Sequence, residues 1–280
     1  MRALVQPGPV SAERIEALRG RCTRFDFRIE PGMSLADAIG RPLIEAGVRA
    51  ATLRFAGAEL EPFRYVMPGP PDGAAHVAYF SAVQAPAGPV RVEIANVTFG
   101  YADGRTLLHC HAAWQEREAG RRGGHILLDE SIVVAPAAIA AWTFVDIGYR
   151  TALDPETNFS LLRPERIDGG DQGHAVVARI RPNEDVCTAV ETIARRHGMR
   201  DAVVHGSLGS LVGARFADGR SVAGPATEVL VRGGEVRDGV AAIDMVVVDM
   251  RGQVHEGRLE RGENPVCITF DLVLEEVAPR

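Results

Sequence analysis

Three histidines, His109, His111 and His125, stand close together in the sequence and could share one metal ion. Side chains alternate between the two faces of a β-strand, so the first two are expected on the same face. Residues 106–114 and 123–128 read as two strands joined by a polar, glycine-containing turn. If this hairpin folds about residue 118, positions 111 and 125 lie directly opposite, with Cβ atoms about 4.5–5.5 Å apart.

Three converging imidazoles offer three nitrogen ligands, and zinc binds histidine nitrogen at about 2.0–2.1 Å. Three protein ligands leave a fourth position open, which is typical of a catalytic or ligand-binding centre rather than of a structural site. The alternative is that the three rings only form hydrogen bonds within a sheet or at a subunit interface. Neutral imidazoles favour zinc among the abundant ions, although nickel, copper and iron also accept them.

Charged side chains flank the predicted hairpin and could act at such a centre. Glu116 and Glu118 could provide a fourth ligand or a general base, and Arg121 and Arg122 could attract an anionic ligand. Charges in a turn are more often simply solvated, and this alternative stays open for all four. Cys110 is expected to face away from the histidines and to lie in the core.

The composition is that of a globular protein long enough for two domains, with 280 residues, of which 46% are hydrophobic and 24% charged. A formal net charge of −6 argues against a general nucleic-acid-binding surface, which needs clustered positive charge. All 31 basic residues are arginine, so a P-loop lysine and a Schiff-base lysine are excluded. The sequence has no secretory signal, no CxxC pair and no apolar run near the roughly 20 residues of a membrane span. We therefore expect a cytoplasmic protein with reduced thiols and no membrane partner.

The chain contains two copies of one unit. The segment RIEP that begins at Arg28 recurs as RIRP at Arg179, an offset of 179 − 28 = 151. A helix and then a run of alternating strands follow in both copies, which predicts the α+β class. We expect two tandem domains, each a mostly antiparallel β-sheet packed with one or two helices. Residues 1–153 and 174–280 are the expected domains, and the Pro- and Gly-containing segment 154–173 is the expected linker.

Both copies predict one helix with matching ends. Ser34 and Asp185 are natural N-cap residues, and Gly47 and Gly198 are natural terminators. A further short helix is expected before the first copy, at residues 11–18.

The second copy has lost the histidines. When the two hairpins are aligned through the glycine before the third histidine, the offset is 257 − 124 = 133. The three histidine positions are then occupied, in the same order, by Ala242, Asp244 and Arg258. The metal site is therefore expected in the first copy.

The whole pattern resembles the PPC (plant-and-prokaryote conserved) domain, known from AT-hook nuclear proteins and from prokaryotic proteins. The pattern is a capped helix, a Gly-Ser-Leu turn at Gly206, strands, and then HCH at 109–111 with GGHI at 123–126. The resemblance covers most of the chain as two tandem copies, the second degenerate. It implies an α+β fold, a tendency to form trimers, and a metal site, with zinc as the expected ion, made by the three histidines. The first copy departs from the pattern because it lacks the Gly-Ser-Leu turn, and the AT-hook core Arg-Gly-Arg-Pro is absent.

These observations lead to one main hypothesis and two alternatives. The main hypothesis is a cytoplasmic homo-oligomer, trimer favoured, that binds zinc and a small ligand and could have a regulatory role. The first alternative is a metal-dependent enzyme of hydrolase or lyase type, which needs a general base near the open metal position. DNA binding is the least favoured, because the chain is acidic and has no AT-hook.

Overall fold

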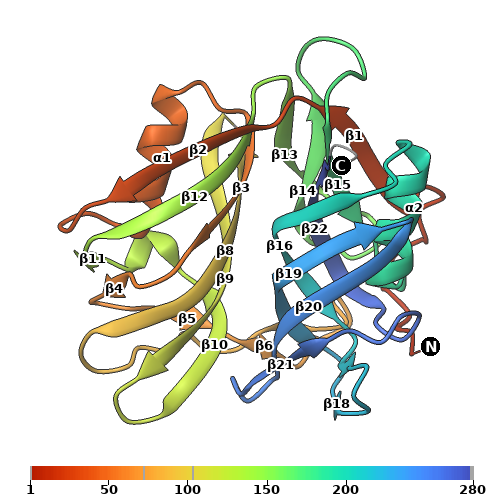
Figure 1. The fold of residues 1–280 in the computed structure, drawn as a ribbon. Coiled ribbons are helices and arrows are strands. Elements are labelled where there is room, and N and C mark those ends of the chain that lie inside the picture. Colours follow the sequence, from red (N-terminus) through yellow and green to blue (C-terminus); the bar gives the residue numbers. More distant parts are fainter. Residues whose placement is uncertain (1, 72, 103, 278–280) are drawn as a thin grey trace.

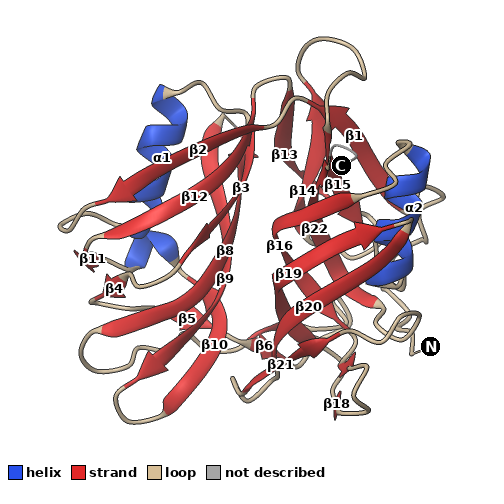
Figure 2. Ribbon diagram, in the orientation of Figure 1, coloured by secondary structure: helices blue, strands red, loops and turns tan. Residues whose placement is uncertain are grey.

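Two β-sheets face each other, and each carries one α-helix on the side away from the other sheet (Figures 1 and 2). The structure is a computed structural model that describes residues 2–71, 73–102 and 104–277. The strands pair almost entirely antiparallel, and α1 and α2 are the two α-helices of the described residues. The α+β class and the two tandem domains are confirmed. None of the helices in this part of the chain is long and apolar enough to cross a membrane.

The first sheet holds the predicted histidine hairpin. Its main path runs in the order β2 (Thr23–Ile29), β12 (Ala137–Phe144), β3 (Ala50–Phe55), β8 (Val90–Ala102), β9 (Arg105–Glu116), β10 (Gly120–Ile126) and β5 (Tyr65–Val66). Four strands join it off this path: β4 (Glu59–Leu60), β11 (Val133–Ala135), β13 (Ile147–Leu153) and β14 (Ser160–Arg166). A short 3-10 helix, Leu128–Glu130, follows the hairpin.

The second sheet repeats the strand order of the first. It runs β1 (Ile15–Gly20), β15 (Ala175–Ile180), β22 (Val266–Glu276), β16 (Ala202–Leu211), β19 (Thr227–Arg237), β20 (Val240–Val248) and β21 (Val254–Arg258). From β15 to β21 this order matches β2 to β10 strand for strand. Two small ribbons complete the described strands: β6 (Pro68–Gly69) with β7 (Tyr79–Phe80), and β17 (Ala214–Arg215) with β18 (Ser221–Val222).

The two helices occupy equivalent places in the two copies. They are α1 (Leu35–Glu45) and α2 (Val186–Arg196), 151 positions apart at both ends. The predicted N-caps form in both, since Ser34 accepts a hydrogen bond from the backbone of Asp37 at 3.0 Å and Asp185 from that of Thr188 at 2.9 Å. Gly47 and Gly198 both take φ of +68°, the left-handed conformation that ends a helix.

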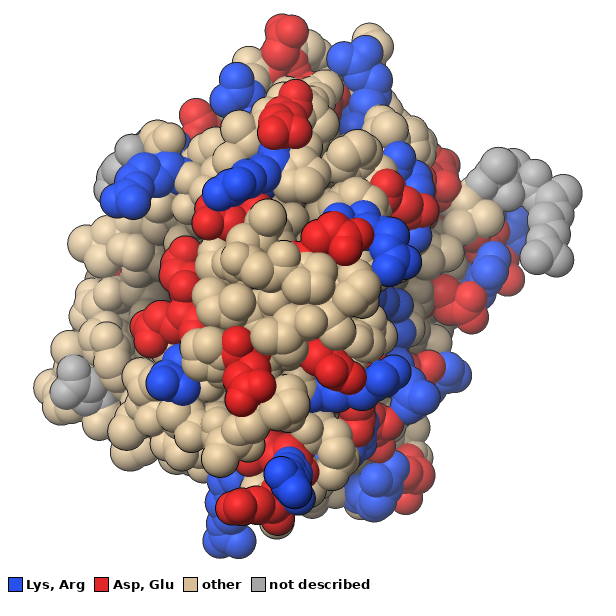
Figure 3. Space-filling view, turned by 90° about the vertical axis from the view of Figure 1, so that its left-hand side faces the viewer, with Lys and Arg blue, Asp and Glu red and all other residues tan. Residues whose placement is uncertain are grey.

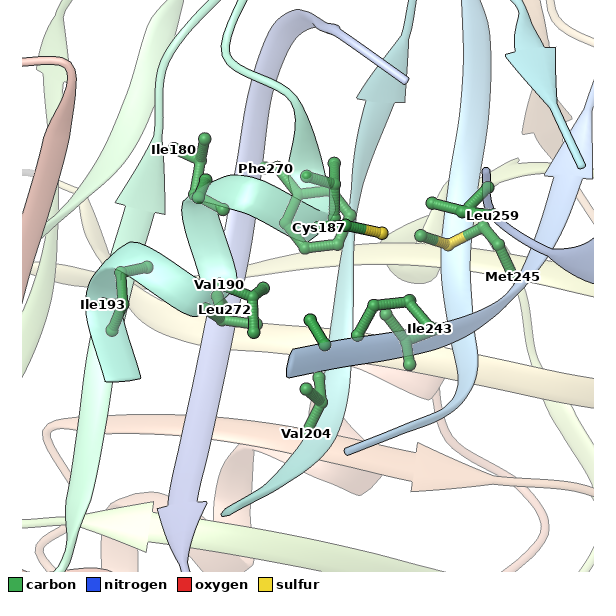
Figure 4. Close-up of a cluster of buried hydrophobic side chains, with 14 of the residues drawn as sticks. Ile180, Cys187, Val190, Ile193, Val204, Ile243, Met245, Leu259, Phe270 and Leu272 are labelled. Atoms are coloured by element: carbon green, nitrogen blue, oxygen red, sulfur yellow. The ribbon is translucent and has the colours of Figure 1, made fainter. Parts of the chain in front are cut away.

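Each helix closes a hydrophobic core against its own sheet. In the second domain the buried stripe of α2 packs on strands β15, β16, β20 and β22, as Figure 4 shows for Val190 and Ile193 with Phe270, Leu272 and Ile243. In the first domain Leu35, Ile39 and Leu43 pack in the same manner. The four cysteines, Cys22, Cys110, Cys187 and Cys267, are free and buried, as expected.

Strand pairing crosses the predicted ends of the two domains, which corrects three sequence predictions. Residues 11–18 are not a helix: Ile15–Gly20 forms β1, which pairs antiparallel with β15 at the edge of the second sheet. The domain 1–153 therefore gives one strand to the other sheet. The segment 154–173 is not a linker throughout, because Ser160–Arg166 forms β14 and pairs with β13 of the first sheet. Exposed backbone at a sheet edge gains hydrogen bonds from such additions.

The Gly-Ser-Leu segment is also not a turn. Gly206 and Ser207 lie inside β16, where the register with β22 shifts between His205 and Leu208. Gly206 has φ of +45°, so a β-bulge, not a chain reversal, explains the glycine. The hydroxyl of Ser207 accepts a hydrogen bond from the backbone of Val273 at 3.1 Å and donates to the carbonyl of His205 at 2.8 Å.

The facing surfaces of the sheets are joined by apolar contacts and by buried polar bonds. Ala113 of β9 packs in one cluster with Leu208, Leu230 and Val246 of the second sheet. Asn96 of β8 donates hydrogen bonds to two carbonyls of the second domain, those of Ser207 at 2.9 Å and Val231 at 2.8 Å. The interface is therefore a packed interior, and side chains of both domains can meet within it.

Candidate metal centre

The β9–β10 hairpin brings the three histidines together as predicted. His125 pairs directly with His111 in the strand register, and His109 lies two residues earlier on the same face of β9. This register follows from the hairpin folding about residue 118. The three side chains point into the space between the two sheets, where His111 is 3% exposed.

The ring nitrogens are close enough to share one ion. One nitrogen from each histidine can be chosen so that all three lie within 4.8 Å of one another. The Nε2 atoms of His109 and His111 are 3.1 Å apart. The ring centroids are separated by 4.6, 5.1 and 5.5 Å, and the rings are tilted or edge-on to one another rather than stacked.

The contacts of the Nδ1 atoms with the second domain leave the Nε2 atoms of His109 and His111 facing each other. Nδ1 of His111 lies 3.0 Å from the carbonyl oxygen of Val229, which only accepts, so Nδ1 carries the proton. Nδ1 of His109 faces the Asp271 carboxylate at 3.5 Å. Nε2 of His111 is then a free acceptor, and Nε2 of His109 lies 3.1 Å from it, which suits an N–H···N hydrogen bond when no ion is bound. The same distance is close to the separation of about 3.3 Å for two nitrogens on one tetrahedral zinc, so the residues fit a metal ion.

Burial keeps His111 and His125 in the state that binds metal. Desolvation lowers the pKa of His111 well below its usual value, and the neighbouring His109 and His125 lower it further. Desolvation likewise lowers the pKa of His125 to about 3. Both rings are therefore neutral near pH 7, and a neutral imidazole has a free lone pair for a metal. Nδ1 of His125 has no hydrogen-bond partner among the described residues.

The second domain completes the surroundings of the histidines, which the sequence analysis missed. Besides the carbonyl of Val229, it supplies the carboxylates of Glu228 on β19 and Asp271 on β22, both buried. Oε1 of Glu228 lies 4.0 Å from Nε2 of His111. Burial raises the pKa of Glu228 well above its usual value. No local signal marks these two residues, because they lie over 100 positions away from His111.

The four charged residues predicted near the site lie elsewhere. Glu116 is on the opposite face of β9, where its Oε1 accepts hydrogen bonds from Tyr65 at 2.9 Å and Trp114 at 3.0 Å. Glu118 is exposed in the turn. Arg121 forms ion pairs with Glu93 and with Glu256 of the second domain.

Arg122 is likewise not turned towards the histidines. Its Nη1 donates a hydrogen bond to the carbonyl of Arg251 at 3.3 Å. A strand places alternate residues on opposite faces, so the even-numbered Glu116 could not share a face with His109 and His111. None of these four residues is among the described residues that line the cavities beside the histidines.

Two adjoining cavities open beside the histidines. One, of about 100 Å³, is lined by His109, His111 and Glu228 and otherwise mainly by apolar groups of both domains. The other, of about 220 Å³, is lined by His109, His125 and Asp271. Phe80 and Phe159 line both cavities. The ring of Phe80 meets that of His125 edge-on, with centroids 5.4 Å apart.

The equivalent place in the second domain is built differently. Asp244 pairs directly with Arg258 in the register of β20 and β21, as the alignment of the two hairpins predicts. Their side chains form an ion pair of 3.0 Å on the surface. The Arg258 guanidinium cannot bind a metal, because it keeps its proton and has no lone pair to offer.

Comparison with known families agrees with the resemblance for the second half of the chain. Residues 167–278 match the Plants and Prokaryotes Conserved (PCC) domain. The matched segment begins directly after β14 and contains the helix α2 and the strands β15 to β22. It is the copy that lacks the histidines. Among curated proteins, no sequence matches this chain.

Several solved structures align with about half of the chain. A PPC protein from Pyrococcus horikoshii has 16% identity and a TM-score of 0.41, covering 57% of this chain and 100% of its own. A metal-containing protein from Archaeoglobus fulgidus has 18% identity and a TM-score of 0.41, covering 50% and 92%. A proposed DNA-binding protein from Ralstonia eutropha has 14% identity and a TM-score of 0.39, covering 49% and 88%.

Proposed function

We propose that this chain, whose residues 167–278 are a PCC domain, binds a metal ion through His109, His111 and His125 and offers it to a small ligand. The observation that carries the proposal is the 3.1 Å approach of two inward Nε2 atoms, with the Nδ1 proton of His111 held by a carbonyl. Zinc is the proposed ion, since three neutral imidazoles with an open fourth position suit it. Nickel, copper and iron are the other candidates.

Metal analysis of the purified protein tests this proposal. We expect about one zinc ion per chain after dialysis against zinc-free buffer, measured by inductively coupled plasma mass spectrometry. His111→Ala and His125→Ala should reduce the metal content to near zero. His174→Ala is the matched control, because this histidine is half-exposed, lies outside the three-histidine cluster and pairs with Glu275 at 3.1 Å. Equal metal content in all four proteins, or none in the wild type, would show that the proposal is wrong.

A metal-dependent enzyme, of hydrolase or lyase type, is the second candidate, and Glu228 favours it. This carboxylate is buried beside the histidines, with Oε1 4.0 Å from Nε2 of His111 and Oε2 without a partner among the described residues. A bound zinc ion would supply Lewis acidity at its open position. Since burial raises the pKa of Glu228, its carboxyl would hold a proton at Oε1 and donate it to the reacting group as a general acid. Once deprotonated, it would serve as the general base.

Hydrolysis of 4-nitrophenyl acetate by the zinc-loaded protein examines this second candidate. If Glu228 acts as a general acid or base, Glu228→Gln should lower the rate by about 10²–10⁴-fold while the zinc content stays unchanged. An equal rate in both proteins would remove Glu228 from this role and leave the binding function.

DNA binding is the least supported candidate. On the face shown in Figure 3, arginine side chains alternate with acidic ones rather than forming a continuous basic surface. Arg121, for example, is held between Glu93 and Glu256. A duplex titration at low salt should therefore give no binding, because affinity for DNA depends on neutralised phosphates.

The assembly and the location of the protein are also part of the proposal. The family resemblance favours a homo-oligomer, with three chains of 30.1 kDa, and light scattering of the purified protein measures its mass. A monomer in that measurement would contradict the proposed trimer. The four buried free cysteines are consistent with the reducing environment of the cytoplasm, where we place the protein.

A further inference from the structure

The cavities beside the histidines have mainly apolar walls, which do not contribute to binding a metal ion. These walls include Phe80, Phe159, Leu161, Ile268 and Ala226. An apolar wall is costly to leave against water, and its burial by a ligand stabilises the complex in proportion to the area covered. The ligand should therefore have an apolar part that lies against this wall.

Three aromatic residues line this space, and two of them are also exposed to solvent. Tyr79 and Phe80, on β7, are 40% and 42% exposed, and Phe159 precedes β14. The ring of Phe159 lies 5.8 Å from that of Tyr79 and 6.5 Å from that of Phe80, measured between centroids. Aromatic faces and edges favour a flat ring as the inserted group.

In the cavity of about 100 Å³ the carboxyl of Glu228 is left for the ligand, and in the adjoining cavity Oδ1 of Asp271 also has no partner among the described residues. Ser210, Thr227 and Thr269 line the smaller cavity, but each hydroxyl has a hydrogen bond within the protein. Oε2 of Glu228 has no such partner among the described residues, and the residue is only 4% exposed. A buried carboxyl oxygen without a partner is unfavourable, so a ligand that brings a hydrogen-bonding group gains by filling the place.

From these contacts we propose that the site takes a compact apolar compound, about the size of one aromatic ring, with a two-part polar head. The head gives one oxygen to the metal held by the histidines and one O–H or N–H group to Glu228. The apolar body lies against Phe80 and Phe159. This inference rests on the proposed metal binding and adds the chemical class of the ligand.

Two hydroxamates separate the parts of this proposal, because they share one head and differ in the body. Benzohydroxamate carries a ring, and acetohydroxamate carries a methyl group. Calorimetric titrations of the zinc-loaded protein measure the affinity of each hydroxamate. Benzohydroxamate should bind at least about tenfold tighter than acetohydroxamate, after this ratio of affinities has been divided by the ratio that the two compounds show for free zinc. The zinc content of the protein is measured again after each titration, so that removal of the metal is recognised.

Variants assign the two parts to their residues. Phe80→Ala and Phe159→Ala should reduce the preference for benzohydroxamate at least about threefold, since each removes part of the apolar wall. Phe25→Ala, on β2 away from the cavities, is the control and should leave the preference unchanged. Glu228→Leu should weaken both hydroxamates to a similar degree, because it removes the contact to the shared head.

The outcomes distinguish the two proposals. A protein that holds no metal overturns the proposed function itself. A protein that holds zinc but binds both hydroxamates with the ratio seen for free zinc overturns the ligand class alone. Since Phe80 is 42% exposed, its alanine variant should fold even if Phe159→Ala does not.

Discussion

Asp244 and Arg258 face each other across β20 and β21 at the place where His111 and His125 face each other across β9 and β10. The first pair is a surface ion pair of 3.0 Å, and the second lies between the domains, with His111 buried and His125 partly buried. The same hairpin frame thus holds a charged pair in one copy and two neutral nitrogen ligands in the other. The surroundings differ accordingly, since only the second pair has carboxylates of the partner domain beside it.

Asp271 should strengthen the metal site although it does not bind the metal itself. Its Oδ2 lies 3.5 Å from Nδ1 of His109 and orients that ring. Asp271→Asn should weaken zinc affinity about 10–100-fold, because partners of ligating histidines fix their tautomer and orientation. Competition with a zinc chelator of known affinity measures the change. Asp244→Asn, at the equivalent hairpin of the second domain, should leave the affinity unchanged.

A buried carboxylate joins the end of the first domain to the second. Oδ2 of Asp154 accepts hydrogen bonds from Arg179 at 2.8 Å and Arg181 at 2.7 Å, and all three side chains are buried. Asp154→Asn should destabilise the protein by up to about 3–5 kcal/mol, because it leaves the buried Arg179 with the more distant Glu16, 3.9 Å away, as its acidic partner. Urea unfolding followed by tryptophan fluorescence measures this. Asp218→Asn, which breaks the exposed pair with Arg220, should change stability by less than about 1 kcal/mol.

The carboxylate of Asp154 should make the stability of the protein depend on pH in the acidic range. Burial alone would raise the pKa of Asp154, but Arg179 and Arg181 outweigh it and lower the pKa from 3.8 to about 2. A folded pKa below the unfolded value stabilises the protein fully above about pH 3.8, and this contribution is lost as the pH falls towards 2. Unfolding midpoints of the wild type and Asp154→Asn, measured from pH 6 to pH 2, should therefore converge in acid. A constant difference over this range would contradict the assignment.

Asn96 should be a main polar contact between the two sheets. Its side-chain amide donates to the carbonyls of Ser207 and Val231, both in the second domain. Asn96→Ala leaves two buried carbonyls with fewer donors and should cost about 2–3 kcal/mol in urea unfolding. Thr143→Ala is a suitable comparison, because its hydroxyl donates only to the carbonyl of Thr23 within the first sheet. A smaller loss for Asn96→Ala than for Thr143→Ala would count against this interface contact.

Patterns among residues near each other in the sequence were enough to predict the repeated helices and the histidine hairpin. The caps at Ser34 and Asp185 fix the helix starts, because a side-chain oxygen satisfies the free backbone donors of the first turn. The opposition of His111 and His125 follows from a two-residue side-chain period and from a hairpin centred at residue 118. Both properties depend on residues near each other in the sequence, and both were predicted correctly.

Partners that come from distant strands could not be predicted in this way. Ile15–Gly20 is a strand only because the edge of β15 is available to pair with it, and its own pattern also suits a helix. Glu228 and Asp271 face the histidines only because the second sheet packs face to face on the first. The chain by itself determines which side chains share a strand face. The packing of the two sheets decides which carboxylates, carbonyls and apolar walls surround the three imidazoles, because burial and contact between distant segments arise only in the folded molecule.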